Sequence, residues 1–252
     1  PRTAAYPALD DPFAAPIADH VRATFEAAGI RTVYAKVYPA GTTDFTPIAA
    51  AMAAARPDVV VAGTQVEDGY ALTRALIGRR FAPSLLFLAN GANAPTEFPA
   101  EVGPANTDGI FSSSDWFADS PAPASTEFVQ AYLRAYGGTA QDIDTTSAEA
   151  YSCGMLVEQV AKRTGKIDNA TLITTLHSGV WPTLVGALSW DADGAPRGSF
   201  LLVQWIDGRL MPVFPVEQAH HAPSVRPLPW AGRLPGELRS PFPAGTATSN
   251  ST

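Results

Sequence analysis

The polar side chains best placed to bind a ligand lie in the loops at residues 9–13, 39–44, 63–68 and 89–95, each directly after a predicted β-strand. In an open parallel sheet, the ligand crevice lies beyond the carboxyl ends of the strands. These loops contribute one aromatic side chain, several amides and several carboxylates: Phe13, Gln65, Glu67, Asp68, Asn90 and Asn93. The set suits hydrogen-bonded recognition of a small polar molecule, because it offers donors and acceptors but no nucleophile beside a base. Each residue by itself is more simply a helix cap or a polar loop residue.

Sequence motifs of catalytic sites are missing. The chain has no Gly-x-Ser-x-Gly elbow, no Gly-rich phosphate loop ending in Lys-Ser/Thr and no His-Glu-x-x-His pair. Residues 191–194 resemble the start of a calcium loop, but the glycine comes too early, and a turn between strands is the better interpretation. Cys153 lies among apolar residues of a predicted helix, which favours a buried structural thiol. We therefore expect a binding protein without metal or cofactor, and an α/β hydrolase that uses crevice carboxylates is the enzymatic alternative.

The elements that must position these loops alternate along the first 90 residues. Strands are predicted at residues 3–8, 32–37, 58–62 and 84–88, because these runs are β-branched, aromatic or continuously apolar. Helices are predicted between them, at residues 12–29, 48–55 and 68–78. Asp10 or Asp11 can cap the first helix, and Asp44 can cap the second. Four strands with three intervening helices predict a parallel, doubly wound α/β sheet.

After Ile110 the pattern changes. Residues 112–114 are all serine and residues 121–123 are Pro-rich, which predicts a segment that crosses away from the sheet. Three helices follow at residues 125–136, 145–163 and 169–176, and a β-hairpin at residues 200–214 turns at Asp207 and Gly208. Three successive helices without strands cannot easily pack on the first sheet. We expect them to belong to a second lobe whose sheet lies outside this sequence.

Composition restricts the class of protein. The net charge of -7 and the pI near 5.0 argue against a nucleic-acid-binding surface. No apolar stretch of about 18 residues occurs, and one cysteine excludes an internal disulfide. A strand is predicted almost at once after Pro1, so we expect the chain to be N-terminally truncated. Residues 216–252 are Pro-rich and predict a tail with little packing, in which Trp230 and Phe242 are the residues expected to touch the body.

Several short segments follow one another in a recognisable order. Residues 10–13 read Asp-Asp-Pro-Phe, residues 38–45 place a glycine loop before Asp-Phe, and residues 55–63 contain Pro-Asp-Val-Val. Residues 148–151 end in a tyrosine on a helix, and residues 188–194 and 203–208 each carry a tryptophan shortly before a glycine. Together these segments resemble the periplasmic substrate-binding proteins of branched-chain amino-acid ABC transporters, the type I, LivJ-like group. The resemblance covers about residues 2–215.

The resemblance implies a fold and a division into lobes. The fold would be the type I periplasmic-binding-protein fold, here a Rossmann-like parallel sheet lobe plus the helical return part of a second lobe. Residues 2–118 and 199–215 would form the C-terminal lobe. Residues 119–198 would belong to the first lobe, whose N-terminal part is absent from the sequence. The segments at residues 116–121 and 181–186 would be hinges.

The resemblance also implies binding residues. Phe13 would cover a ligand in the cleft between the lobes, Gln65 would approach it after the third strand, and Tyr151 matches the helix motif. Ala89 and Asn90 lie in the loop where amino-acid binders of this group carry a carboxylate that faces the ligand ammonium. Because this loop contains no acidic residue, amides, aromatic acids and small carboxylates are candidate ligand classes in addition to amino acids.

The implied function is extracytoplasmic capture of a small polar ligand, an amino acid or a related compound, for delivery to the permease of an ABC importer. The implied location is the periplasm or the cell exterior, and the membrane would be reached only through a signal or lipid anchor ahead of Pro1. No nucleic-acid partner is expected. A ligand-sensing receptor domain of the same fold is the alternative to transport.

Overall fold

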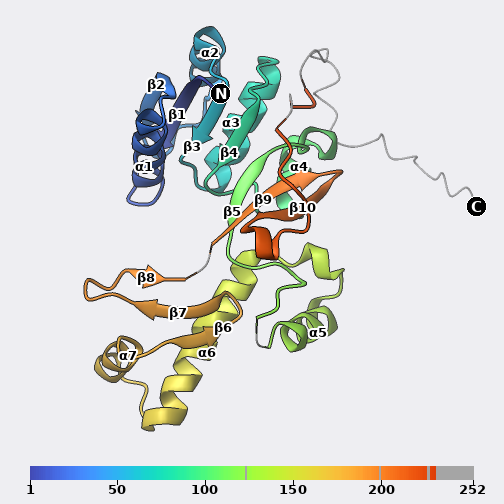
Figure 1. Ribbon diagram of the computed structural model, residues 1–252. Coiled ribbons are helices and arrows are strands. Elements are labelled where there is room, and N and C mark those ends of the chain that lie inside the picture. The colour runs from blue at the N-terminus through green and yellow to red at the C-terminus, as the bar shows by residue number, and fades with distance from the viewer. Residues whose placement is uncertain (123, 199, 226–227, 231–252) are drawn as a thin grey trace, which may run out of the picture.

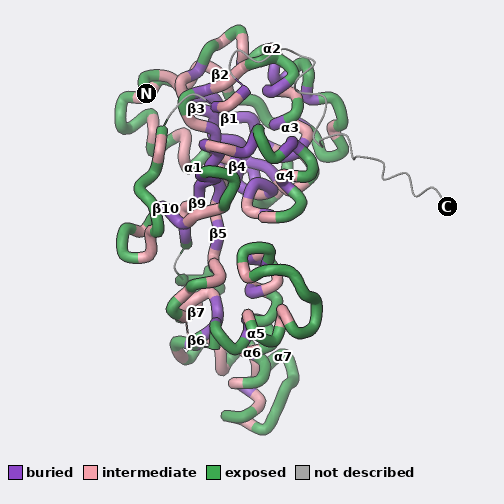
Figure 2. The backbone as a smooth tube through the Cα atoms, turned by 90° about the vertical axis from the view of Figure 1, so that its right-hand side faces the viewer, coloured by how far each residue is buried: buried purple, intermediate pink, exposed green. Residues whose placement is uncertain are grey.

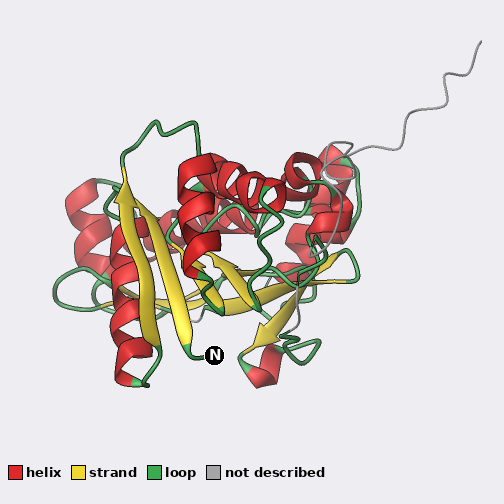
Figure 3. Ribbon diagram, turned by 90° about the horizontal axis from the view of Figure 1, so that it is seen from above, coloured by secondary structure: helices red, strands yellow, loops and turns green. Residues whose placement is uncertain are grey.

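The computed structural model describes residues 1–122, 124–198, 200–225 and 228–230. Its largest feature is a seven-stranded sheet in the order β10-β9-β5-β4-β3-β1-β2 (Figure 1). The strands are β1 (Thr3–Leu9), β2 (Arg31–Tyr38), β3 (Val59–Ala62), β4 (Leu85–Leu88), β5 (Phe111–Ser114), β9 (Leu201–Ile206) and β10 (Arg209–Phe214). The first five are parallel, while β9 and β10 are antiparallel to their neighbours. Figure 3 shows the twist of these strands. The predicted α/β sheet is confirmed.

Helices cover both faces of this sheet. They are α1 (Ala14–Ala27), α2 (Thr46–Ala55), α3 (Val66–Gly78) and the short α4 (Glu97–Val102), followed by a 3-10 turn at Pro104–Asn106. In β3, Val59 and Val61 pack with Ala18 of α1, whereas Val60 packs with Met52 of α2. All four residues of this strand are buried because side chains of a strand alternate between faces and both faces are covered.

Residues 115–198 form a second part, which we call the helical body, and residues 1–114 with the described part of 200–230 form the sheet body. The helical body holds α5 (Ser125–Tyr136), a 3-10 turn (Ala140–Asp142), α6 (Thr145–Thr164) and α7 (Asn169–Leu176). It also holds a small sheet of β6 (Trp181–Thr183), β7 (Gly186–Trp190) and β8 (Pro196–Arg197). The chain passes between the two bodies after β5 and again before β9 (Figures 1 and 2). None of the described helices is long and apolar enough to cross a membrane.

Three details differ from the sequence analysis. The residues of β5 were expected in a crossing segment, but they pair with β4 and β9. Serine suits the interior of this strand because the hydroxyls of Ser112 and Ser113 donate to the carbonyls of Leu88 and Ala89, each at 2.8 Å. The expected turn at residues 191–194 lies between β7 and β8, but the pairing of β6 with β7 was not expected, because residues 181–186 were predicted to be a hinge. Cys153 is exposed rather than buried, because it lies on the outer face of α6.

The segment after β10 was expected to be a tail with little packing, but its described residues pack back onto the sheet body. The side-chain amide of Gln204 donates to the Ser224 carbonyl at 2.6 Å, and the Ser224 N–H donates back to the Gln204 oxygen at 2.8 Å. Trp230 is fully buried, and its Nε1 donates to the carbonyl of Phe81 at 2.9 Å. The expected contact of Trp230 with the body is therefore confirmed, whereas Phe242 lies outside the described residues.

Candidate functional site

Three loops meet at the carboxyl edge of the large sheet, because β1, β3 and β4 are parallel neighbours. The loop after β1 is organised by Asp11, whose Oδ1 accepts the backbone N–H of Phe13 at 2.9 Å and of Ala14 at 2.5 Å. Of the two predicted caps, Asp11 is therefore the residue that holds the start of α1. Its second carboxylate oxygen remains available to the neighbouring loop.

A row of hydrogen-bonded side chains, Asp11, Gln65 and Asn90, joins the three loops; we call it the row. The Nε2 of Gln65, after β3, donates to Oδ2 of Asp11 at 2.9 Å. The Nδ2 of Asn90, after β4, donates to Oε1 of Gln65 at 3.4 Å. The structure thus brings the predicted residues Gln65 and Asn90 together and links both to Asp11. Sequence reasoning assigned Asp11 only a capping role, and the pairing of its second oxygen depends on strand order.

Two carboxyl groups lie in or beside the row, those of Asp11 and Asp68. The backbone N–H of Ala14, followed by the Gln65 amide, lowers the pKa of Asp11, so this carboxylate stays ionised at neutral pH. Asp68 accepts from the Gln65 backbone N–H at 2.9 Å and from the hydroxyl of Tyr38, and burial raises its pKa. The loop after β4 supplies no acid, but Asp11 brings a carboxylate to the same edge from the loop after β1.

The other predicted residues lie in different surroundings. Phe13 is 43% exposed at the start of α1, on the same edge. Ala89 is buried, and its backbone is held by the Ala62 carbonyl at 2.9 Å and the Ser113 hydroxyl at 2.8 Å. Tyr151 comes from α6 in the helical body, where its half-exposed ring packs on Phe128 with centroids 5.0 Å apart.

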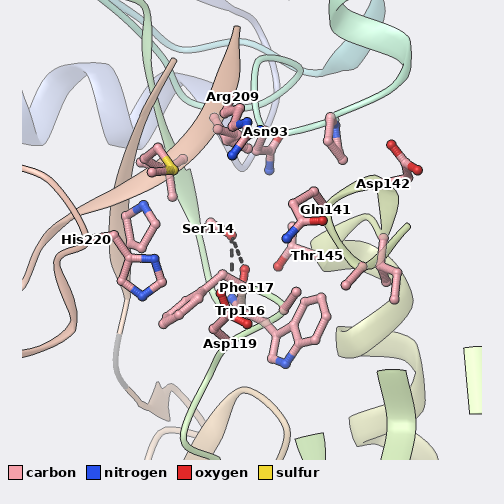
Figure 4. Close-up of a pocket in the computed structure, with 18 of the residues that line it drawn as sticks. Asn93, Ser114, Trp116, Phe117, Asp119, Gln141, Asp142, Thr145, Arg209 and His220 are labelled. Atoms are coloured by element: carbon pink, nitrogen blue, oxygen red, sulfur yellow. Dashed lines mark hydrogen bonds between the residues drawn. The ribbon is translucent and has the colours of Figure 1, made fainter. Parts of the chain in front are cut away.

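A cavity of about 360 Å³ lies between the two bodies next to this edge (Figure 4). The loop after β4 connects the row to the cavity, because the Gly91 N–H donates to Asn90 at 2.8 Å and to Asn93, which lines the cavity, at 3.0 Å. Other walls come from residues 114–119, residues 140–145 and the β9–β10 hairpin. The volume falls within the range of small-molecule sites.

The walls of this cavity combine flat apolar surfaces with polar groups. The buried Trp205 is fixed by its Nε1 donating to the Ala92 carbonyl at 2.7 Å, and the buried Trp116 by donating to the Ser125 hydroxyl at 3.0 Å. Phe117 packs edge-on against His220, with centroids 4.8 Å apart. The polar lining comprises Asn93, Ser114, Asp119, Gln141, Asp142, Thr145, Arg209 and His220. Sequence reasoning missed most of these residues because β5 was not recognised as a strand, and because the others come from the helical body, the β9–β10 hairpin and the segment after it.

A pair of carboxyl groups lies where the chain leaves β5. Burial raises the pKa of Asp115, and burial together with the charge of Asp115 raises the pKa of Glu149. The Thr145 hydroxyl donates to Glu149 at 3.5 Å. Within the described ranges, no group of three or more His, Cys, Asp or Glu could hold a metal ion.

Comparison with solved structures identifies the fold. A solute-binding protein of an R. palustris ABC transporter, solved with 4-hydroxybenzoate, is 23% identical with a TM-score of 0.66, over 83% of this chain and 58% of its own. A second R. palustris solute-binding protein, solved with benzoate, is 15% identical with a TM-score of 0.70, over 89% and 61%. A leucine-binding protein from Thermotoga maritima is 16% identical with a TM-score of 0.67, over 84% and 59%. The chain thus spans about three fifths of these proteins.

No curated protein matches the chain. Residues 2–209, however, match the family described as Periplasmic binding protein. This range includes both bodies, the hydrogen-bonded row and most of the cavity lining. The family is one of binding proteins and not of enzymes, so the absence of a nucleophile–base pair from the strand-end loops agrees with it. The chain belongs to the periplasmic binding protein family.

Proposed function

We propose that this chain is part of the solute-binding protein of an ABC importer and takes up a small ligand between its two bodies. The observation that carries this proposal is the row of Asp11, Gln65 and Asn90, which lies at the strand ends of a chain of this family. The row leaves open hydrogen-bonding groups, because the amide nitrogens of Gln65 and Asn90 each carry a second N–H.

The solved neighbours and the polar groups of the site support a proposed ligand class. The neighbours bind leucine, benzoate or 4-hydroxybenzoate. We propose that this chain binds a compound of the same two classes, an amino acid or an aromatic acid. The proposed ligand-binding residues are Phe13, Gln65, Asn90 and Tyr151. Ala89 is buried, so its proposed role is to hold the conformation of the loop.

We also propose a two-lobed organisation. Residues 2–118 and 199–215 would form one lobe, and residues 119–198 would be the return part of another lobe. Exposed apolar side chains on α5, α6 and α7 support this division: Tyr136 is 77%, Val157 42% and Ile173 60% exposed. Such surfaces are typical of a face that other protein covers. Residues 216–252 would be an addition whose described part packs on the lobe of residues 2–118 and 199–215.

The proposed partner is the permease of an ABC importer, and the proposed location is the periplasm or the cell exterior. Closure of two lobes on a ligand would create the surface that docks on the permease. Stimulation of the ATPase of a reconstituted importer by the liganded protein tests this partner. A protein that binds its ligand without stimulating any importer would instead be a sensor.

Ligand binding is tested by thermal unfolding of the chain, together with any residues that its gene encodes before Pro1, in the presence of amino acids, amides and aromatic acids. A ligand that binds only the folded state stabilises it by about 2.7 kcal/mol at a hundredfold excess over its Kd. Gln65→Leu should weaken the shift, whereas Gln130→Leu, at an exposed position of α5, should leave it unchanged. A folded protein whose midpoint no compound raises would overturn the proposal.

A further inference from the structure

The positive charge near the candidate site comes from one side chain. The strand-end loops at residues 9–13, 63–68 and 89–95 contain carboxylates but no Lys, Arg or His. Among the described residues that line the cavity, Arg209 is the only Lys or Arg. An anionic group of a ligand would therefore be stabilised at Arg209 rather than at the strand ends, where Asp11 is ionised.

The hairpin holds Arg209 at the cavity wall. Asp207 and Gly208 have φ values of 50° and 74°, as a two-residue type I′ turn requires, and Arg209 is the first residue of β10, paired with Ile206. In the described part of the chain no carboxylate forms a salt bridge with its guanidinium. The turn thus fixes the backbone of Arg209, and its exposed guanidinium remains available to a ligand.

A second donor lies beside it. Figure 4 shows the side chains of Arg209 and Asn93 next to each other at one end of the cavity. Since Oδ1 of Asn93 accepts the Gly91 N–H, the amide nitrogen is the end left to donate. A guanidinium fork and an amide N–H₂ together match the oxygens of a carboxylate.

The lining contains two acidic residues, Asp119 and Asp142. Asp142 accepts the backbone N–H of Thr139 at 2.7 Å and its hydroxyl at 2.8 Å, so its charge is already hydrogen-bonded within its own turn. Asp119 lies at the opposite end of the cavity in Figure 4 and is exposed. Among the described lining residues, the one Lys or Arg therefore lies at the end opposite Asp119.

Between the two ends the walls are flat and apolar. Trp116 and Trp205 are 3% and 2% exposed, and Phe117 adds a third ring. We propose that this cavity binds a small carboxylate with a planar apolar body, such as a benzoate, and that Arg209 and Asn93 hold its carboxylate. Because the walls belong to both bodies, such a ligand would also hold the bodies together. The proposal names the ligand class of the solute-binding function and rests on it. It adds Arg209 and Asn93 to the four ligand-binding residues proposed above, none of which lines the cavity.

The test compares benzoate with its neutral amide and with an aliphatic amino acid. The protein is titrated with benzoate, benzamide and leucine by isothermal calorimetry, with tryptophan fluorescence as a second signal. Benzoate should bind at least about tenfold more tightly than benzamide, because charge-assisted hydrogen bonds are about twice as strong as neutral ones. Arg209→Gln should weaken benzoate about tenfold and leave benzamide unchanged, while Arg209→Lys should give an intermediate loss.

Arg31→Gln serves as the matched control, since Arg31 is an exposed arginine on β2, the opposite edge strand of the same sheet. It should leave all affinities unchanged. Equal affinity for benzoate and benzamide, or an Arg209→Gln protein that binds benzoate normally, would overturn the proposed site. Binding of leucine without benzoate would overturn the ligand class while the solute-binding function stands. A folded protein that binds none of these compounds, nor any other amino acid or aromatic acid, would overturn that function too.

Discussion

Trp230 should be one of the main supports of the sheet body, although it lies in a Pro-rich segment beyond the last strand. Its side chain is 0% exposed and belongs to the same core cluster as Leu72, Leu76 and Leu86. Its indole N–H also satisfies the Phe81 carbonyl at 2.9 Å. Replacing a buried tryptophan by alanine costs about 3–5 kcal/mol, because apolar contacts are lost and a cavity remains.

A second variant separates the contribution of the indole hydrogen bond to the free energy of unfolding from that of the apolar contacts. Trp230→Phe keeps an aromatic ring but removes the N–H, so it should cost about 1–3 kcal/mol, the penalty of an unsatisfied buried carbonyl plus some lost packing. Trp230→Ala should cost at least about 3 kcal/mol. The control is Val225→Ala, in the same segment at a side chain that is 62% exposed, which should stay within about 0.5 kcal/mol.

The free energy of unfolding is measured by urea denaturation, followed by far-UV circular dichroism so that the signal does not depend on tryptophan itself. Trp230→Ala should shift the midpoint to lower urea concentration, and Val225→Ala should not. If Trp230→Ala unfolds at the wild-type midpoint, the segment after β10 is not part of the core, and the argument from its burial is refuted.

Three further predictions concern the site and its surroundings. Glu149→Gln should raise the thermal midpoint at pH 7, because burial and then the charge of Asp115 raise the pKa of Glu149 in the folded state. In the wild-type protein, a Glu149 pKa that is raised in the folded state contributes stability at low pH, and this stability is lost as the pH rises through the folded pKa. The gain in thermal midpoint from Glu149→Gln should therefore vanish below pH 4.5, the ordinary pKa of a glutamate. An equal gain at all pH values would contradict this cause. Gln65→Glu replaces a donor to Asp11 by a second carboxylate and should destabilise the protein by about 1 kcal/mol at pH 7, measured by urea unfolding; an unchanged midpoint would show that the row contributes nothing to stability. Gly63→Ala should cost about 2 kcal/mol or more by the same assay, because a Cβ there would lie 2.2 Å from a backbone carbonyl oxygen at the start of α1; a loss below about 0.5 kcal/mol would mean that the helix moves freely.

Much of the fold could be predicted from local sequence. The buried run of β3, the Asp207–Gly208 turn and the Asp168 cap of α7, whose carboxylate accepts the Thr171 N–H at 3.0 Å, each depend on residues close in sequence. The strand-end rule likewise located Gln65 and Asn90 correctly in adjacent loops. Short elements escaped prediction, since β5 consists mainly of serines, and the hydroxyls of Ser112 and Ser113 find their acceptors in the carbonyls of Leu88 and Ala89, at the end of β4 and directly after it.

The sequence by itself determined the class of the fold and the kind of polar residue at its edge, because alternation, caps and turns are local properties of the chain. Tertiary structure alone decided which residues meet. Asp11 accepts a hydrogen bond from Gln65, 54 positions further along the chain, and the buried Trp230 donates to the carbonyl of Phe81, which lies 149 positions before it. Arg209 and Asn93 reach one end of the same cavity because β9 and β10 return beside β5, next to the loop after β4. Such contacts depend on strand order and on the position of two bodies, and no local pattern of residues encodes either.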